Sequence, residues 1–157
     1  MSNELLMKHF DNRLLPHMKQ QAASVGSKIG RSLDEITFEP LGQYCNDNEF
    51  ARRWVEECSP RPKDMNLTIG TGCDPLRIED MEWHHQNDEQ GQDMFKLNLM
   101  YIGIAGDGET FVVSMDTGRV YLMQHQWTLD EYEFEDCISQ QWDDIPSFLD
   151  TLIAENL

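Results

Sequence analysis

The chain has 157 residues and a formal net charge of −17, from 12 basic and 29 acidic side chains. This length suits one domain, and a hydrophobic fraction of 39% with 15 aromatic residues suffices for a packed core, which argues against an acidic disordered chain. No apolar run is long enough for a transmembrane helix, and the first residues lack the apolar core of a signal peptide, so we expect a cytoplasmic protein.

The negative charge is confined to one part of the chain. Residues 1–63 hold nine basic and nine acidic side chains, whereas residues 64–157 hold three basic and twenty acidic ones. Such a field repels nucleic acid and anionic membranes and attracts basic partners. The alternative is that the acidity serves only to keep the protein in solution.

Apolar residues at helical spacing predict two helices in the N-terminal half. The first covers 3–15 and ends or is interrupted at Pro16, because proline lacks the N–H that a helix interior needs. The second runs from a capping box, with Asn46 as the cap and Glu49 three residues later, to about Cys58.

Short apolar runs at 67–70 and 76–79 predict two short strands, and the polar stretch 83–91 predicts a loop or, at its start, an edge strand. Three longer strands are then expected. Their ranges are 95–104, 109–115 and 119–124. The first alternates apolar and polar residues, as a half-buried strand does. Gly106-Asp107-Gly108 and Asp116-Thr117-Gly118 supply the turns, because glycine readily adopts the left-handed conformation.

The C-terminal part contains one ambiguous segment and one clear helix. Residues 127–136 mix acidic and aromatic side chains, and the pattern fits either a loop or a helical turn. Apolar residues from Ile145 to Ile153 recur at helical spacing, with Ser139 or the pair Asp143-Asp144 as the cap. The whole pattern predicts an α+β fold of one domain, 1–157, in which helices flank a mostly antiparallel sheet.

No motif in the sequence points to catalysis, a cofactor or a metal. The four cysteines form no CxxC pair, and the adjacent His84 and His85 would point in opposite directions on a strand. Asp116-Thr117-Gly118 resembles the aspartic-protease tripeptide, but Arg119 follows it, and a hairpin turn explains it better. His125 is the histidine that we would test first as a general base.

The best candidate surface for a protein partner is the acidic and aromatic C-terminal region. Its aromatic side chains can anchor a partner, and its carboxylates can meet basic groups. The alternative is that the aromatic rings face the core and the carboxylates are merely solvated. The candidate partner-binding residues are Trp127, Asp130, Glu131, Tyr132, Glu133, Glu135, Asp136, Asp143 and Asp144.

The C-terminal half resembles the SUKH superfamily, which includes bacterial toxin-immunity proteins and fungal regulators of cell-wall synthesis. The resemblance rests on Ile102-Gly103, Gly106-Asp107-Gly108, Phe111-Val112-Val113, the run from Asp116 to Tyr121 with His125, and the closing helix Ile145-Pro146-Ser147-Phe148-Leu149. The N-terminal third departs from that family's pattern. The resemblance implies an α+β domain that binds a protein and has no common catalytic residues.

The leading hypothesis is therefore a non-enzymatic cytoplasmic immunity protein that neutralises a toxin through its acidic surface, in the manner of a nucleic-acid mimic if the toxin is a nuclease. One alternative is a regulatory or scaffold module that binds a host protein. Another is a hydrolase that uses His125 and a nearby carboxylate. The sequence predicts no nucleic-acid or membrane partner and leaves the oligomeric state open.

Overall fold

The structure is a computed structural model that describes residues 3–62, 66–124 and 128–155. At its centre lies a five-stranded sheet in which every neighbouring pair of strands is antiparallel and the strands follow one another in chain order. The strands are β1 (Asp74–Pro75), β2 (Leu99–Ile104), β3 (Thr110–Ser114), β4 (Val120–Met123) and β5 (Ile138–Trp142).

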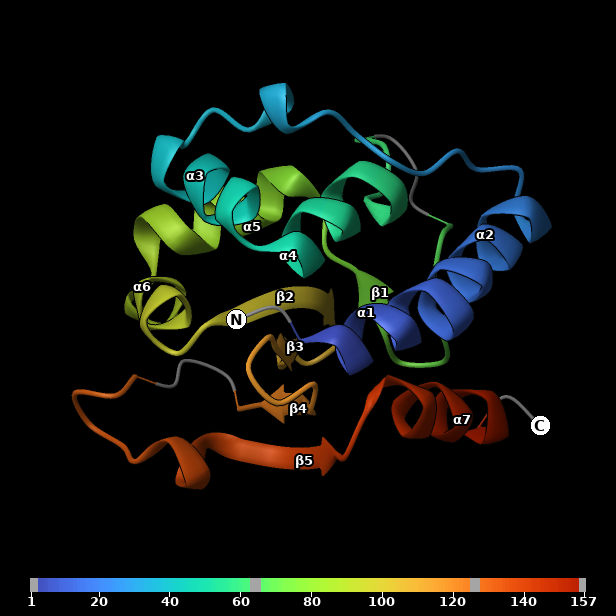
Figure 1. The fold of residues 1–157 in the computed structure, drawn as a ribbon. Helices are drawn as coiled ribbons and strands as arrows, with labels where there is room; N and C mark the ends of the chain where they lie inside the picture. Colours follow the sequence, from blue (N-terminus) through green and yellow to red (C-terminus); the bar gives the residue numbers. More distant parts are fainter. Residues whose placement is uncertain (1–2, 63–65, 125–127, 156–157) are drawn as a thin grey trace.

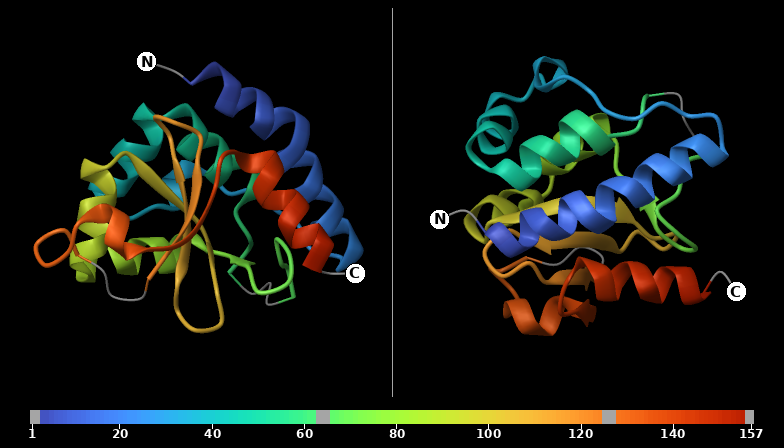
Figure 2. Two further views of the ribbon diagram at one scale, coloured as in Figure 1. Left: turned by 90° about the horizontal axis from the view of Figure 1, so that it is seen from below. Right: turned by 45° about the vertical axis from the view of Figure 1, so that its right-hand side comes forward.

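Helices cover both faces of this sheet (Figures 1 and 2). The α-helices are α1 (Glu4–His9), α2 (Leu15–Ser24), α3 (Glu39–Asp47), α4 (Glu49–Arg53), α5 (Ile78–Asn87), α6 (Glu89–Lys96) and α7 (Ile145–Glu155). α5 and α6 lie on one face, where His85 packs on Tyr101, and α1, α2 and α7 lie on the other, where Phe148 packs on Phe111. The predicted α+β fold with an antiparallel sheet and flanking helices is thereby confirmed.

The three predicted central strands and both glycine turns are present, with one boundary wrong. Gly108 and Gly118 have φ values of 92° and 81°, as the turns require. Phe95 belongs to α6, and β2 begins only at Leu99, because Asn98 adopts a left-handed φ of 55° that ends the helix. β2 is also buried on both faces rather than half-buried, since helices cover both sides of the sheet.

Pro16 does not end the first helix, which is a correction to the prediction. A π-helical turn, Phe10–Leu14, follows α1 and leads into α2, and Pro16 lies in the first turn of α2. The Leu15 N–H donates to the Phe10 carbonyl five residues back, and this π-helical turn lets the helix accommodate Pro16, which has no N–H. The predicted apolar stripe of this segment is buried at Leu6, Phe10 and Leu14.

The second predicted helix is present and ends at Cys58 as predicted, but its start is wrong. Asn48, not Asn46, lies at the boundary, with extended backbone, between α3 and α4. α4 continues as a π-helical turn, Trp54–Cys58. The sequence pattern missed α3, in which only Leu41 and Cys45 are buried.

The region between 67 and 96 differs most from the prediction. Residues 76–79 are not a strand, because α5 begins at Ile78, and 67–70 contributes only an isolated bridge between Gly70 and Cys73. Residues 83–91 are helical rather than a loop. Their buried positions, His85, Gln90 and Gly91, carry no large apolar side chain, so the sequence shows no apolar periodicity there.

The core extends over both helical layers and the sheet and includes all four cysteines, which are free and buried. At the C-terminal end, Trp142 of β5 packs on Phe148 of α7 with ring centroids 5.0 Å apart. Within the described parts of the chain, no helix is both long enough and apolar enough to traverse a lipid bilayer.

Candidate functional site

The predicted partner-binding residues flank β5, which is the last strand of the sheet. The segment before β5 forms a turn, in which the Tyr132 N–H donates to the Thr128 carbonyl at 3.0 Å, and then a 3-10 turn, Phe134–Cys137. The Leu129 N–H donates to the Asp93 carboxylate at 3.0 Å, which fixes this segment against α6. Of the two predicted forms, a loop or a helical turn, the described part of this segment adopts the helical turn.

Six carboxylates around β5 are exposed to solvent. None of them forms an ion pair with another residue of the described ranges. We refer to them as the β5-flanking carboxylates. They are Asp130, Glu131, Glu133, Glu135, Asp136 and Asp143.

Asp144 has a different role, although it follows Asp143 directly. The Ser147 N–H donates to its Oδ1 at 2.8 Å, which makes Asp144 the N-terminal cap of α7. This hydrogen bond lowers the pKa of the Asp144 carboxyl below its usual value. Ser139, the alternative cap, lies in β5. Asp144 is therefore a structural residue rather than a free contact.

The aromatic residues of the segment divide between surface and core. Tyr132 is 51% exposed and is available to a partner. Phe134 packs edge-on against Tyr121 of β4 at 5.3 Å, so this ring faces the core. Trp127 and His125 lie outside the described residues.

β5 itself was not predicted. Its three central residues, Ser139, Gln140 and Gln141, are polar and exposed, so neither an apolar run nor an alternation marks the strand. The one sequence signal is that Ile138 and Trp142, both half-buried, bracket these polar residues.

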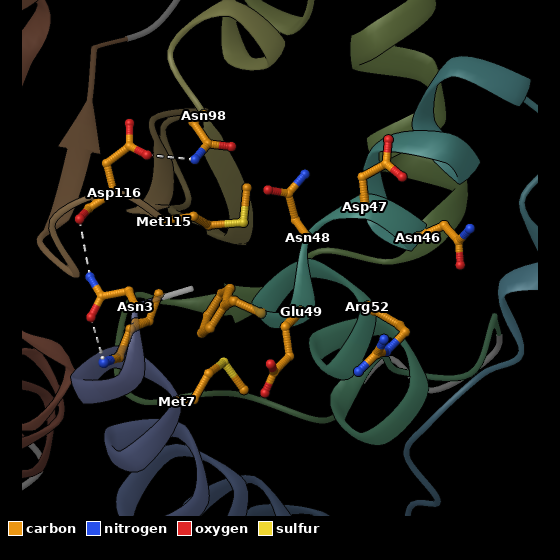
Figure 3. A pocket seen from close by; sticks show the side chains of 12 residues that line it. Asn3, Met7, Asn46, Asp47, Asn48, Glu49, Arg52, Asn98, Met115 and Asp116 are labelled. Carbon is orange, nitrogen blue, oxygen red and sulfur yellow. Dashed lines mark hydrogen bonds between the residues drawn. The ribbon is translucent and has the colours of Figure 1, made fainter. Parts of the chain in front are cut away.

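A second candidate is an open cleft of about 390 Å³ between α1, the α3–α4 boundary and the turn after β3 (Figure 3). The buried Met7 and Met115 line it, together with side-chain amides, carboxylates and the guanidinium of Arg52. The amides belong to Asn3, Asn46, Asn48 and Asn98, the carboxylates to Asp47, Glu49 and Asp116.

Most of the polar groups in this cleft hold the fold together. Asn3 donates to the Asp116 carbonyl at 3.1 Å and accepts from the Leu6 N–H at 3.0 Å. Asn98 donates to the Asp116 carboxylate at 2.8 Å, and Asn48 donates to the carbonyl of Tyr44 at 2.8 Å. The bonds to Asp116 join the start of α1 and the residue before β2 to the turn after β3, and the bond of Asn48 closes the end of α3, so the cleft is explained as a structural joint.

The histidines on α5 offer one arrangement that resembles a general base. His84 Nδ1 lies 2.8 Å from Asp88 Oδ2. Asp88 is also the boundary residue between α5 and α6, and no Ser, Thr or Cys side chain of the described chain is hydrogen-bonded to His84. His85 is buried with its Nδ1 2.6 Å from the Gly91 carbonyl, and burial lowers the pKa of His85 to about 4. Both contacts stabilise the α5–α6 corner.

The buried thiols are poorly suited to nucleophilic attack. Burial raises the pKa of Cys45 to about 12 and holds the pKa of Cys73 well above its usual value, so both thiols stay protonated at neutral pH. Among the residues with described positions, no three His, Cys, Asp or Glu side chains are grouped so that they can hold a metal ion.

Comparison of the chain with protein-family models, with curated proteins and with solved structures found no match. The resemblance to the SUKH superfamily therefore remains a prediction from the residues that carry it.

Proposed function

We propose that this protein binds a basic partner protein through the surface around β5, without catalysing a reaction. The observation that carries the proposal is the set of β5-flanking carboxylates, which are exposed and have no cationic partner in the described structure. Like charges so close together repel one another, and a basic partner relieves that repulsion.

Tyr132 supports the same surface, because it supplies an exposed aromatic ring beside Glu131 and Glu133. Tyrosine contributes strongly to protein interfaces through its large ring and its polar hydroxyl. A ring surrounded by carboxylates suits a partner surface that presents lysine or arginine around an apolar contact.

We further propose that the partner is a toxin and that the protein is its cytoplasmic immunity protein. The resemblance to the SUKH superfamily supports this part of the proposal. If the toxin is a nuclease, its active cleft must be basic to hold nucleic acid, and an acidic surface can occupy that cleft in place of the substrate.

The test uses the purified protein and the basic proteins encoded beside its gene. We expect one of them to bind at 50 mM salt, with an affinity at least tenfold weaker at 300 mM salt because exposed charges are then screened. Co-expression of the two proteins should also protect cells against the partner.

An absence of binding to all of these proteins would contradict the proposal of an immunity protein. Binding that is insensitive to salt would contradict the part of the proposal that assigns the contact to the β5-flanking carboxylates.

A further inference from the structure

β5 has one neighbour, β4, and its other edge carries no strand of the described chain. In Figure 1 it runs along the lower margin of the molecule. A strand with an open edge presents backbone donors and acceptors that can pair with another extended chain. β1, at the other end of the sheet, has only two residues.

The register of the sheet identifies which backbone groups of β5 face the open edge. The Ser114 N–H donates to the Arg119 carbonyl at 2.9 Å, which sets the alternation of bonded and non-bonded pairs across β3 and β4. By this alternation the N–H and C=O of Tyr121 in β4 face β3. Its partner Gln141 in β5 therefore forms a non-bonded pair with it, and the N–H and C=O of Gln141 point away from β4. The Gln141 side chain is exposed as well.

The charges around this edge select what can pair with it. The β5-flanking carboxylates lie in the chain on both sides of Gln141, so a second copy of this acidic chain would bring like charges together. Ser139 is an extra residue opposite β4, a bulge that confines regular pairing with any added strand to Gln140–Trp142. A strand rich in lysine or arginine meets opposite charges instead.

We infer that the open edge of β5, at Gln140–Trp142, pairs with an extended basic strand of the partner protein. The inference rests on the proposed function and specifies how the partner is held. Backbone hydrogen bonds to Gln141 supply the pairing, and the β5-flanking carboxylates select lysine or arginine on the partner strand.

The test uses a short capped peptide of alternating lysine and threonine as the probe. Its matched control has the same sequence with N-methyl groups on two consecutive central residues, so that both edges of the peptide lose a donor but its charge is unchanged. A peptide of alternating glutamate and threonine controls for charge. Binding is followed through the backbone amide signals of the protein and through hydrogen exchange.

We expect the basic peptide to shift the amide signals of β5 and to slow exchange of the Gln141 amide roughly tenfold at saturation, because that N–H becomes hydrogen-bonded. The methylated peptide should bind at least tenfold more weakly. Gln141→Pro should weaken binding of the basic peptide to the same level, with an unchanged unfolding midpoint, because proline is tolerated where a strand N–H faces solvent.

Equal binding of the basic and methylated peptides would overturn strand pairing and leave an acidic surface that binds by charge alone, so the proposed function would survive. Equal binding of the acidic peptide, or shifts centred away from β5, would also overturn the inference. If Gln141→Pro fails to fold, the two basic peptides decide the question with the unaltered protein.

Discussion

The carboxylates of this protein serve two different purposes in two regions. Among residues 1–80 several carboxylates are bound to arginines: the buried Arg31 side chain donates to Glu79 at 2.6 and 2.7 Å and to Glu35 at 3.1 and 3.2 Å. The β5-flanking carboxylates have no such partner in the described structure. The carboxylates bound to arginines stabilise the fold, whereas the β5-flanking carboxylates are exposed and can contact another molecule.

The contrast follows from where the arginines lie in the chain. Arg53 repeats the arrangement of Arg31, since it contacts Asp11 at 2.7 Å and Glu57 at 2.6 Å and lies over the ring of Phe10. No comparable cation follows in the sequence near β5, because residues 120–157 contain neither lysine nor arginine. Substitutions that affect stability or binding can test this contrast between carboxylates bound to arginines and the β5-flanking carboxylates.

Replacing the buried arginine should have the largest effect on stability. We expect Arg31→Met to lower the free energy of unfolding by about 2 kcal/mol, because it removes the charged hydrogen bonds that join α5 to the segment between α2 and α3 while the apolar stem is kept. The cost is limited since the two glutamates are partly exposed and return to water. Urea denaturation measures the change.

Arg119→Met is the matched control, because Arg119 is exposed and has no ion pair with the described residues. It should change stability by less than about 0.5 kcal/mol. Equal effects of the two substitutions would show that the Arg31 contacts stabilise no more than a surface charge does.

The neighbours Asp143 and Asp144 give a finer test. Asp144→Ala should cost about 1 kcal/mol because it removes the cap of α7, whereas Asp143→Ala should cost less than about 0.3 kcal/mol. The Ser147 hydrogen bond lowers the pKa of Asp144 in the folded state. The stabilisation from this bond is therefore complete above the unfolded-state pKa of Asp144 and is lost as the pH falls through the lower folded-state pKa. Thermal unfolding of both variants at neutral and strongly acidic pH checks this, and equal losses at neutral pH would remove the distinction between the two residues.

The smallest effect on stability is expected where the charge is greatest. Glu131→Gln with Glu135→Gln should leave the free energy of unfolding unchanged or raise it by up to about 0.5 kcal/mol, because it relieves repulsion without breaking an ion pair. The same denaturation experiment measures it. A loss of more than about 1 kcal/mol would mean that these carboxylates are structural, contrary to the comparison.

The sequence predicted those elements whose burial is one-sided and periodic. The helix that includes Ile145, Phe148 and Leu149 was predicted because its apolar stripe packs on the sheet, and the turns at Gly108 and Gly118 because their backbone requires glycine. The helices α5 and α6 were missed because polar residues, among them His85, Gln90 and Asp93, occupy several of their buried positions, so no apolar stripe marks them.

The candidate site was predicted in part. The acidity of 130–136 is a property of the sequence, and its exposure follows from it. The position of this segment beside an open strand edge could not be predicted. The central residues of β5, Ser139, Gln140 and Gln141, show no apolar pattern, and their pairing with β4 depends on contacts distant in the chain. The sequence did not separate Asp144 from Asp143, because either aspartate can cap a helix here and the first helical residue decides between them.

We propose that the β5 surface binds because of where the β5-flanking carboxylates lie, and not because of the net charge of the protein. This proposal is tested with two charge-matched variants, Glu131→Lys with Glu135→Lys and, as the control, Asp34→Lys with Glu39→Lys. Both Asp34, in the 3-10 turn Leu33–Glu35, and Glu39, the first residue of α3, are exposed. α3 lies on the opposite side of the molecule from β5 (Figure 1). Both variants change the net charge by the same amount.

The measurement is the dissociation constant of each variant for the basic protein, encoded beside the gene, that binds the unaltered chain. We predict a loss of at least roughly tenfold for the variant at Glu131 and Glu135 and less than about twofold for the control. Equal losses in both variants, or no loss in the first, would contradict the account.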